Sequence, residues 1–157
     1  GPRSEEGGMQ IRQSAELVDE VIKEALKHTG QSRTGRTIKV EEEDELILAK
    51  MDARLIVQVL INLIKNAKEA CSRKEHPRIE VKMLPALSWQ CLITVSDNGE
   101  GILPEVQDKI FVQFFTTKPS GSGIGLSLCK QVMNRHGGNI TVQSTVGKGS
   151  CFTLLFG

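Results

Sequence analysis

Two glycine-containing segments carry the residues of this chain best suited to chemistry. The first, Asp97-Asn98-Gly99-Glu100-Gly101-Ile102, places a carboxylate directly before a turn. A carboxylate can accept a hydrogen bond from an exocyclic amine, and Gly99 and Gly101 would let a ligand approach the backbone closely because glycine has no Cβ. Asp-Asn-Gly is also common in ordinary turns. Taken alone, the segment leaves a ligand site and a structural turn both open.

The second segment, Gly121-Ser122-Gly123-Ile124-Gly125-Leu126, leads directly into a helical pattern. Free backbone N–H groups at a helix start, together with the helix dipole, can bind phosphate. A glycine run can equally be a flexible linker. Two phosphate loops are excluded, because the segment does not follow a predicted strand as a dinucleotide fingerprint does, and the chain has no Gly-Lys-Ser or Gly-Lys-Thr of the P-loop kind.

Two asparagines stand four residues apart in a helical, otherwise apolar stretch. Asn62 and Asn66 would share one face of that helix, where asparagine has poor intrinsic propensity. Their amide oxygens are suitable ligands for Mg²⁺, which also takes phosphate oxygens and waters. The alternative is that both amides cap backbone groups of a neighbouring loop. The pair therefore indicates either a metal site or a structural contact.

The composition is that of a single globular domain of 157 residues, with 39% hydrophobic and 25% charged residues. The net charge is +1 and basic residues alternate with acidic ones, which argues against an electrostatic nucleic-acid binder. The cysteines lack C-x-x-C spacing, so buried reduced thiols are expected and a zinc site is not; they are Cys71, Cys91, Cys129 and Cys151.

The chain has no apolar run long enough to span a bilayer and no signal peptide. We therefore expect a cytoplasmic module without direct membrane contact, whether or not a parent protein is membrane-anchored. Residues 1–8 resemble the remnant of a protease site followed by a linker, so residues 9–157 are expected to form the domain, as a monomeric fragment of something longer.

Apolar spacing predicts three helices, over Ser14–Lys27, Arg54–Lys74 and Ile124–Arg135. Asp52 is placed to cap the second helix, whose apolar residues are spread so widely that burial against a sheet is expected. Alternation and turn residues predict strands over Ile38–Glu41 (at an edge), Arg78–Leu84, Gln90–Ser96, Asn139–Ser144 and Ser150–Phe156, with a further apolar patch at Leu46–Ala49.

A long loop over residues 99–122 follows the strand that ends near Asp97, and loops of this length are usually functional or mobile. The strands come in pairs, which favours an α+β sandwich over a doubly wound parallel sheet. We predict a two-layer α/β sandwich, with a mixed, mostly antiparallel sheet covered on one face by about three helices.

In this order the segments resemble the nucleotide-binding motifs of the ATPase and kinase superfamily with the Bergerat fold, which contains gyrase, Hsp90, MutL and the histidine kinases. The resemblance covers roughly residues 52–156. The matching segments are Asn62–Ala70 (the N box), Asp97–Ile102 (the G1 box), Ile110–Phe115 (the F box), Gly121–Leu126 (the G2 box) and Gly147–Phe152 (a final glycine box).

Within the superfamily, Phe114-Phe115-Thr116-Thr117-Lys118 followed by Gly121–Leu126 is similar to bacterial sensor histidine kinases. The resemblance implies ATP and Mg²⁺ as cofactors. Asp97 would read the adenine amino group, with Gly101 beside it and Ser150 assisting through water.

The same resemblance implies that Asn66 binds the Mg²⁺ that bridges the phosphates, with Asn62 assisting one turn earlier. Residues 99–122 would then be an ATP lid that opens and closes over the nucleotide. Lys118 could reach the γ-phosphate, although a surface-loop lysine is often only solvated. Phe111 and Phe114 would anchor the lid. The other implied nucleotide-binding positions are Gly99, Ile102, Thr117, Gly121, Gly123, Ile124, Gly125 and Leu126.

One departure from the superfamily separates kinase from hydrolase. Its ATPases use a glutamate as general base at the position of Asn62, and an amide cannot take a proton from water at neutral pH. We therefore expect a protein-histidine kinase catalytic domain that holds ATP for an incoming nucleophile. A hydrolytic ATPase and an ATP-sensing module of the same fold are the alternatives.

The histidines His28, His76 and His136 all stand outside an acidic, amphipathic hairpin of the kind that carries a phosphoacceptor, and we predict them to be surface or capping residues. The implied partners are therefore ATP, a separate dimerisation and phosphoacceptor hairpin, and a response regulator indirectly, but no nucleic acid.

Overall fold

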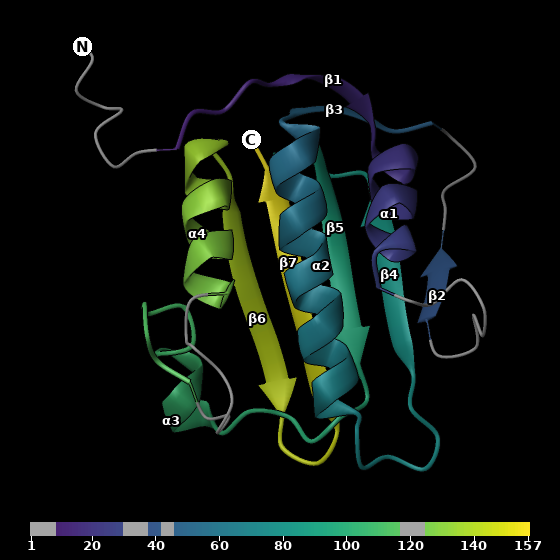
Figure 1. The fold of residues 1–157 in the computed structure, drawn as a ribbon, viewed down its shortest axis with the longest axis vertical. Coiled ribbons are helices and arrows are strands. Elements are labelled where there is room, and N and C mark those ends of the chain that lie inside the picture. Colours follow the sequence, from purple (N-terminus) through teal and green to yellow (C-terminus); the bar gives the residue numbers. More distant parts are fainter. Residues whose placement is uncertain (1–8, 30–37, 42–45, 117–124) are drawn as a thin grey trace.

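The computed structural model describes residues 9–29, 38–41, 46–116 and 125–157. A five-stranded sheet forms one of its two layers (Figure 1). Neighbouring strands pair antiparallel, except that β2 and β4 run parallel. The order across the sheet is β2 (Ile38–Glu41), β4 (Ile79–Leu84), β5 (Cys91–Asp97), β7 (Gly149–Phe156) and β6 (Asn139–Thr145).

Three helices lie side by side across one face of this sheet (Figure 1): α1 (Val18–Lys27), α2 (Ala53–Ala70) and α4 (Gly125–Arg135). This arrangement confirms the predicted α+β sandwich with a mixed, mostly antiparallel sheet, and β2 is an edge strand as expected. The position of the helices follows from the sheet, because its inward face is apolar and must be covered.

The core lies between these layers. Along β5, Cys91, Ile93 and Val95 are buried while the residues between them are half-exposed, as the two-residue period of a strand requires. The α2 face that meets the sheet is broad, as predicted, and each of its large aliphatic side chains contributes about 1.5–3 kcal/mol by burial; its buried residues are Ile56, Val57, Val59, Leu60, Leu63, Ile64 and Ala67.

The prediction of a helix from Ser14 is wrong in its first turn. Residues Ser14–Leu17 form β1, which pairs antiparallel with β3 (Leu48–Met51), and the ribbon runs along the ends of the helices (Figure 1). The helix begins at Val18, whose N–H is bonded to the carbonyl of Ile47 at 3.0 Å. A partner about thirty residues away in sequence decides this boundary, so helical spacing alone could not find it.

The second helix ends at Ala70, four residues before the predicted end. A continuing helix would need the Ala70 carbonyl for the N–H of Lys74. That carbonyl instead accepts the N–H of Glu100 at 3.2 Å, and the Lys74 N–H is bonded to Cys71 at 2.9 Å. The turn after β5 therefore ends α2.

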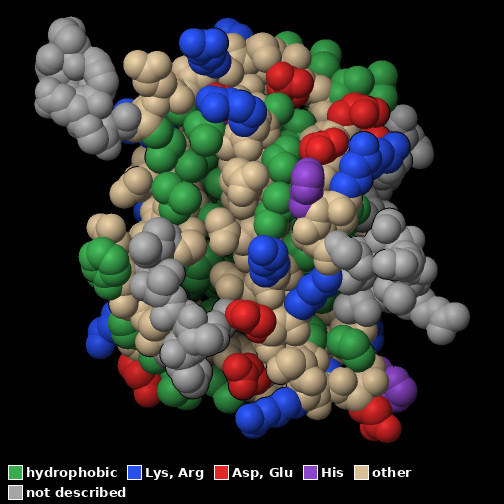
Figure 2. All heavy atoms as spheres, viewed as in Figure 1, with side chains coloured by type: hydrophobic (Ala, Val, Ile, Leu, Met, Phe, Trp, Pro, Cys, Tyr) green, Lys and Arg blue, Asp and Glu red, His purple; other side chains and the backbone are tan. Residues whose placement is uncertain are grey.

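The predicted loop 99–122 also needs correction within its described part. It contains a one-turn helix, α3 (Pro104–Gln107), followed by further turns up to residue 114. No described helix is long and apolar enough to cross a membrane. Over the helical face of the molecule, basic and acidic side chains are interspersed (Figure 2), in keeping with the net charge of +1.

Candidate functional site

Asp97 is the last residue of β5 and lies opposite Ser150 of β7 in the sheet. Its Oδ1 accepts the N–H of Gly99 at 2.8 Å, which forms the turn that follows. Burial raises the pKa of the half-buried carboxyl, and hydrogen bonds from the backbone N–H groups of Gly99 and Ser150 offset only part of that rise. The carboxylate is held in place by backbone donors, and no Lys or Arg among the described residues forms an ion pair with it.

The two glycines of this turn are required by the protein's own backbone. A Cβ on Gly99 would lie 2.4 Å from the carbonyl oxygen of Ala70, at the end of α2. Gly101 has a φ of 80° and a Cβ there would lie 2.4 Å from the carbonyl oxygen of Thr145. The turn is therefore packed between α2 and the β6–β7 hairpin, which gives the glycines a structural reason that is independent of any ligand.

Asn98, which lies between Asp97 and Gly99, is a structural residue. Its Oδ1 accepts the N–H of Arg78 at 2.8 Å, and its Nδ2 donates to the carbonyl of His76 at 3.0 Å. These bonds hold the turn after Asp97 against the residues that precede β4 and so fix the path of the chain at the end of β5.

Asn62 and Asn66 are both half-buried and lie on one face of α2, one turn apart. The Nδ2 of Asn62 donates to the carbonyl of Gln58 within the same helix at 3.3 Å. A Cβ on Gly125, the first residue of α4, would lie only 3.0 Å from the Oδ1 of Asn62. The start of α4 is therefore seated directly against the Asn62 amide.

The last turns of α2 thus contact both the turn after Asp97 and the start of α4. Ala70 meets the turn that follows Asp97, and Asn62 meets the start of α4, with Asn66 between them. Eight residues of helix separate Ala70 from Asn62, a distance of about 12 Å along the axis. A carboxylate at one end, a helix N-terminus at the other and amides between them can bind an extended ligand with a base and phosphates.

The two phenylalanines predicted to anchor the lid differ in the structure. Phe111 is half-buried and packs edge-on against Phe152, with ring centroids 6.3 Å apart, and the Nζ of Lys130 lies 5.8 Å from its centroid. Phe114 is 67% exposed and has a φ of 71°. Phe114 therefore buries little of its ring, whereas Phe111 packs against β7, and the roles of both in a lid stay predictions.

The structure also identifies polar residues at the site that sequence reasoning missed. Ser150, which the sequence did predict, is 7% exposed, and its hydroxyl is 2.8 Å from the hydroxyl of Ser144, which the sequence did not predict. Gln107 of α3 donates to the carbonyls of Ile102 and Ser144. Nothing in the sequence singles out Ser144 or Gln107, because their partners lie far along the chain.

Two further predicted nucleotide positions, Ile102 and Leu126, are partly buried and pack against the hydrophobic core. Five others lie outside the described residues, and their roles stay predictions: Thr117, Lys118, Gly121, Gly123 and Ile124.

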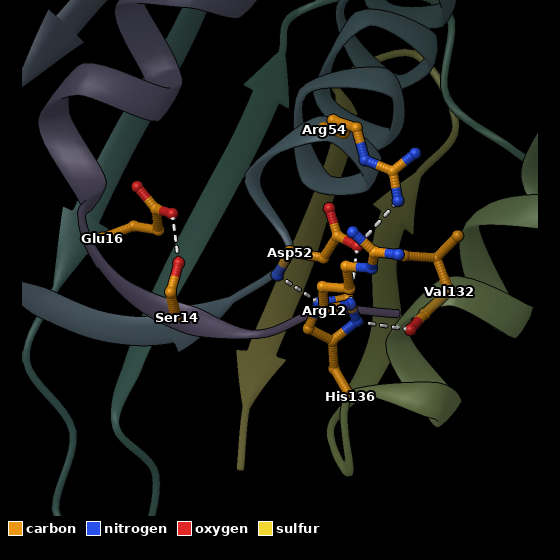
Figure 3. Close-up of polar contacts among 7 residues, drawn as sticks. All are labelled: Arg12, Ser14, Glu16, Asp52, Arg54, Val132 and His136. Carbon is orange, nitrogen blue, oxygen red and sulfur yellow. Dashed lines mark hydrogen bonds and ion pairs between the residues drawn. The ribbon is translucent and has the colours of Figure 1, made fainter. Parts of the chain in front are cut away.

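A second polar cluster lies at the opposite end of α2 (Figure 3). Asp52 precedes this helix, but its side chain makes no capping bond, so that prediction is wrong. Its Oδ2 instead accepts the N–H of Arg12 at 2.9 Å and the guanidinium of Arg54 at 3.0 Å. Burial by itself would raise the pKa of this carboxyl, yet these two donors outweigh it and lower the pKa.

His136 belongs to the same cluster and is 5% exposed, so it is a capping residue as predicted but not a surface one. Its Nε2 accepts the N–H of Asp52 at 2.9 Å, which leaves the proton on Nδ1 to be donated to the carbonyl of Val132 at 2.8 Å. The neutral ring thereby joins the end of α4 to the start of α2 (Figure 3).

The four cysteines are free, and three of them are buried as expected. Burial raises the pKa of Cys91 to about 11 and that of Cys129 to about 12, so these thiols are unreactive at neutral pH. Among the described residues, no group of three or more His, Cys, Asp or Glu side chains could hold a metal ion.

Comparisons with known proteins match this arrangement. The family described as "Histidine kinase-, DNA gyrase B-, and HSP90-like ATPase" matches residues 51–157. The chain is 41% identical over 120 residues to the signal transduction histidine-protein kinase AtoS of Escherichia coli K12, covering 73% of this chain and 19% of AtoS. It is 34% identical over 139 residues to the sensor histidine kinase ZraS of Salmonella typhimurium, covering 87% of this chain and 30% of ZraS.

The fold is similar to the nucleotide-free catalytic domain of the histidine kinase ThkA, with a TM-score of 0.80 and 30% sequence identity. The superposition covers 93% of this chain and 95% of that domain. The chain thus corresponds to nearly the whole of a solved catalytic domain but to less than a third of the length of AtoS or ZraS.

Proposed function

The chain belongs to the histidine kinase-, DNA gyrase B- and HSP90-like ATPases, as the ATP-binding catalytic domain of a sensor histidine kinase, and we propose that it donates the γ-phosphoryl of ATP to a histidine on a separate dimerisation and phosphoacceptor domain. The observation that carries the proposal is the alignment of the site along α2. The Ala70 end of this helix meets the Asp97 turn, and its Asn62 amide meets the start of α4.

We assign the base to the Asp97 end. The carboxylate is half-buried and is held by the Gly99 N–H at 2.8 Å, so it keeps one direction for accepting a hydrogen bond from the adenine amino group. Guanine carries a carbonyl at the corresponding ring position, which would face the carboxylate oxygen without a proton between them. Adenine should therefore be preferred over guanine.

We assign the phosphates to the other end, at the start of α4. The N–H groups in the first turn of a helix have no acceptor within that helix and lie at its positive dipole end, and both features favour phosphate oxygens; α4 has eleven residues. Since Gly125 lies against Asn62, the start of α4 is beside the amide to which we assign a role in catalysis. Lys118, Gly121 and Gly123 are proposed to complete this end.

Mg²⁺ fits the donor set through Asn66. Mg²⁺ prefers oxygen ligands and keeps several waters, so one amide oxygen together with phosphate oxygens is sufficient without a dedicated protein cage. Asn66 lies between the base end and the phosphate end of α2. When bound, the ion would neutralise phosphate charge, and the contribution of Asn66 is to fix its position.

The proposal of a kinase over a hydrolase rests on Asn62. Its amide donates to Gln58 and cannot remove a proton from water, so the site holds ATP without activating hydrolysis. Catalysis would then depend on positioning and on charge neutralisation, as in other phosphoryl transfers. The γ-phosphoryl passes to an imidazole nitrogen, the bond to the bridging oxygen breaks, and ADP leaves.

The acceptor is proposed to lie in another domain. His136 is buried with both ring nitrogens bonded, and exposed His28 is bonded to Glu24 at 3.1 Å. His76 is also exposed, in the turn that follows α2, where its carbonyl accepts the Asn98 amide. None of these three settings resembles the surface of a helical hairpin.

Calorimetry with ATP, ADP and GTP, with and without Mg²⁺, tests the binding site. We expect adenine preference together with tighter ATP binding when Mg²⁺ is present. Phosphotransfer is tested by adding the dimerisation hairpin of the parent kinase and [γ-³²P]ATP, with an acid-labile phosphohistidine as the expected product. Steady ATP hydrolysis by the isolated domain would instead support a hydrolase, and Mg²⁺-dependent binding without phosphohistidine would support an ATP-sensing module.

A further inference from the structure

Two residues outside the recognised motifs join α3 to the β6–β7 hairpin. The Nε2 of Gln107 donates to the carbonyl of Ile102 at 2.9 Å and to the carbonyl of Ser144 at 3.2 Å. The hydroxyl of Ser144 accepts the N–H of Ile102 at 2.8 Å. The N–H of Ile102 is therefore bonded to the side chain of Ser144, and its carbonyl to the side chain of Gln107. The Gln107 side chain is in turn bonded to the backbone of Ser144.

The Ser144 hydroxyl also connects this junction to the strand that faces Asp97. It donates to the carbonyl of Gly149 at 3.0 Å and lies 2.8 Å from the hydroxyl of Ser150. Ser150 is the register partner of Asp97 in the sheet. The hydrogen-bonded network thus runs from α3, through β6 and β7, to the residue assigned to the base.

Backbone contacts hold the preceding turn from both sides. The carbonyl of Glu100 accepts the N–H of Gly147 at 2.8 Å, and the N–H of Glu100 donates to Ala70 at 3.2 Å. Without the side chains of Gln107 and Ser144, Glu100 would keep its two backbone contacts, but Ile102 would lose the bonds to its N–H and to its carbonyl. The segment from Ile102 to Gln107 would then be free to move away from the base end of the site.

We propose that Gln107 and Ser144 are positioning residues for nucleotide binding, which hold the segment Ile102–Gln107 in place as the wall beside the base. The inference rests on the proposed function. Its basis is that Glu100 is bonded to α2 and to the β6–β7 hairpin, while Ile102 and Gln107 are bonded to Ser144 of that hairpin.

The sharpest variant is Gln107→Glu, which keeps the shape of the side chain but places a carboxylate against two carbonyl oxygens. The matched control is Glu105→Gln, which exchanges the same two side chains in the opposite direction at an exposed position of the same helix. Ser144→Ala removes the hydroxyl, and Ser144→Thr restores one on a residue that suits a strand.

Binding of ATP and of AMP is measured for each variant below its melting temperature. We expect Gln107→Glu and Ser144→Ala to weaken both nucleotides by the same factor, about 3- to 10-fold, since one or two hydrogen bonds that position the base wall are lost. Glu105→Gln should match the wild type, and Ser144→Thr should recover most of the affinity lost in Ser144→Ala.

Hydrogen exchange without nucleotide supplies a second readout, because the amide of Ile102 should exchange faster in Gln107→Glu and Ser144→Ala than in the wild type, while the amide of Gly147, which keeps its bond to Glu100, serves as the internal reference. Unchanged exchange and affinity would overturn the proposal. So would a loss confined to ATP, or a lower melting temperature with unchanged affinity. If the wild type binds neither nucleotide, the proposed function fails by itself, and any role of these residues in nucleotide binding fails with it.

Discussion

Replacing Asp97 by asparagine tests the base end of the site with little structural change. The variant keeps a side-chain oxygen that can accept the Gly99 N–H, which Asp97 accepts at 2.8 Å. It loses the negative charge, and its amide can present N–H groups toward the adenine amine. Asp97→Asn should therefore alter recognition of the base while leaving the turn after β5 folded.

The expected loss of affinity follows from the kind of bond removed. Hydrogen bonds to charged groups contribute roughly 1.5–3 kcal/mol, which corresponds to an ATP affinity about 10- to 150-fold weaker. The stability of the free domain should not fall at neutral pH. Burial raises the pKa of Asp97 above its ordinary value of 3.8, so its stabilising contribution is complete below that value and is lost as pH rises through the higher folded-state pKa.

The same shift predicts the pH dependence of binding. As pH falls through the raised pKa of Asp97, the carboxylate is protonated and the wild type should lose the charged acceptor for adenine. Asp97→Asn has no such group, so the affinity ratio of wild type to variant should shrink toward one in acid. ATP itself also titrates, because its terminal phosphate changes charge at about pH 6. Since both proteins bind the same ATP, this effect cancels in the affinity ratio.

The assay is calorimetric titration with Mg·ATP between neutral pH and the lowest pH at which the domain stays folded, accompanied by thermal unfolding. Asp108→Asn, which removes an exposed carboxylate in the same segment, is the matched control and should bind like the wild type at every pH. The reasoning is refuted if Asp97→Asn binds ATP within twofold of the wild type at neutral pH. A constant affinity ratio across the pH range would refute the protonation argument.

Three further substitutions separate catalysis, stability and packing. Asn66→Ala should lower phosphotransfer about 100-fold and ATP affinity by less than ~10-fold, because misplaced phosphates affect the reaction more than binding; equal losses in a radiolabel assay and in calorimetry would remove the metal role. His136→Phe leaves the buried N–H of Asp52 without its acceptor, while the Val132 carbonyl keeps the backbone N–H of residue 136, so urea unfolding should show a loss of about 1–3 kcal/mol, and an unchanged midpoint would contradict the hydrogen bond from Asp52. Gly99→Ala places a Cβ 2.4 Å from the Ala70 carbonyl oxygen, so it should destabilise the domain by about 1–3 kcal/mol in thermal unfolding, and full stability would mean that the turn can shift freely.

Much of the architecture could be predicted because it depends on local patterns. Apolar and polar residues alternate in β4, β5 and β7, and α2 has a broad apolar face. Both patterns show which side chains are buried, and both can be recognised from residues that are close together in sequence. The errors lie where a distant partner decides. Residues 14–17 became a strand through pairing with β3, and α2 ended early because the Glu100 N–H took the carbonyl of Ala70.

The site divides in the same way. Asp97, Asn62 and Asn66 could be selected from their residue types, because a carboxylate before a turn and amides on an apolar helix are unusual without a polar partner. Gln107 and Ser144 could not be selected in this way, since each is an ordinary polar residue with partners in another element. The difference between Phe111 and Phe114 was also invisible, because only packing distinguishes a buried ring from an exposed one.

By itself, the sequence determined the class of fold, the order of the nucleotide motifs and the amide at Asn62 that favours a kinase. These depend on residue identity and spacing, which the chain carries whatever its conformation. Only the tertiary structure decided that the Asp97 turn and the start of α4 meet opposite ends of the same stretch of α2, and that Gln107 is bonded to both Ile102 and Ser144. Hydrogen bonds and close packing act over a few ångströms, so contacts between residues far apart in sequence arise only when the folded backbone brings them together.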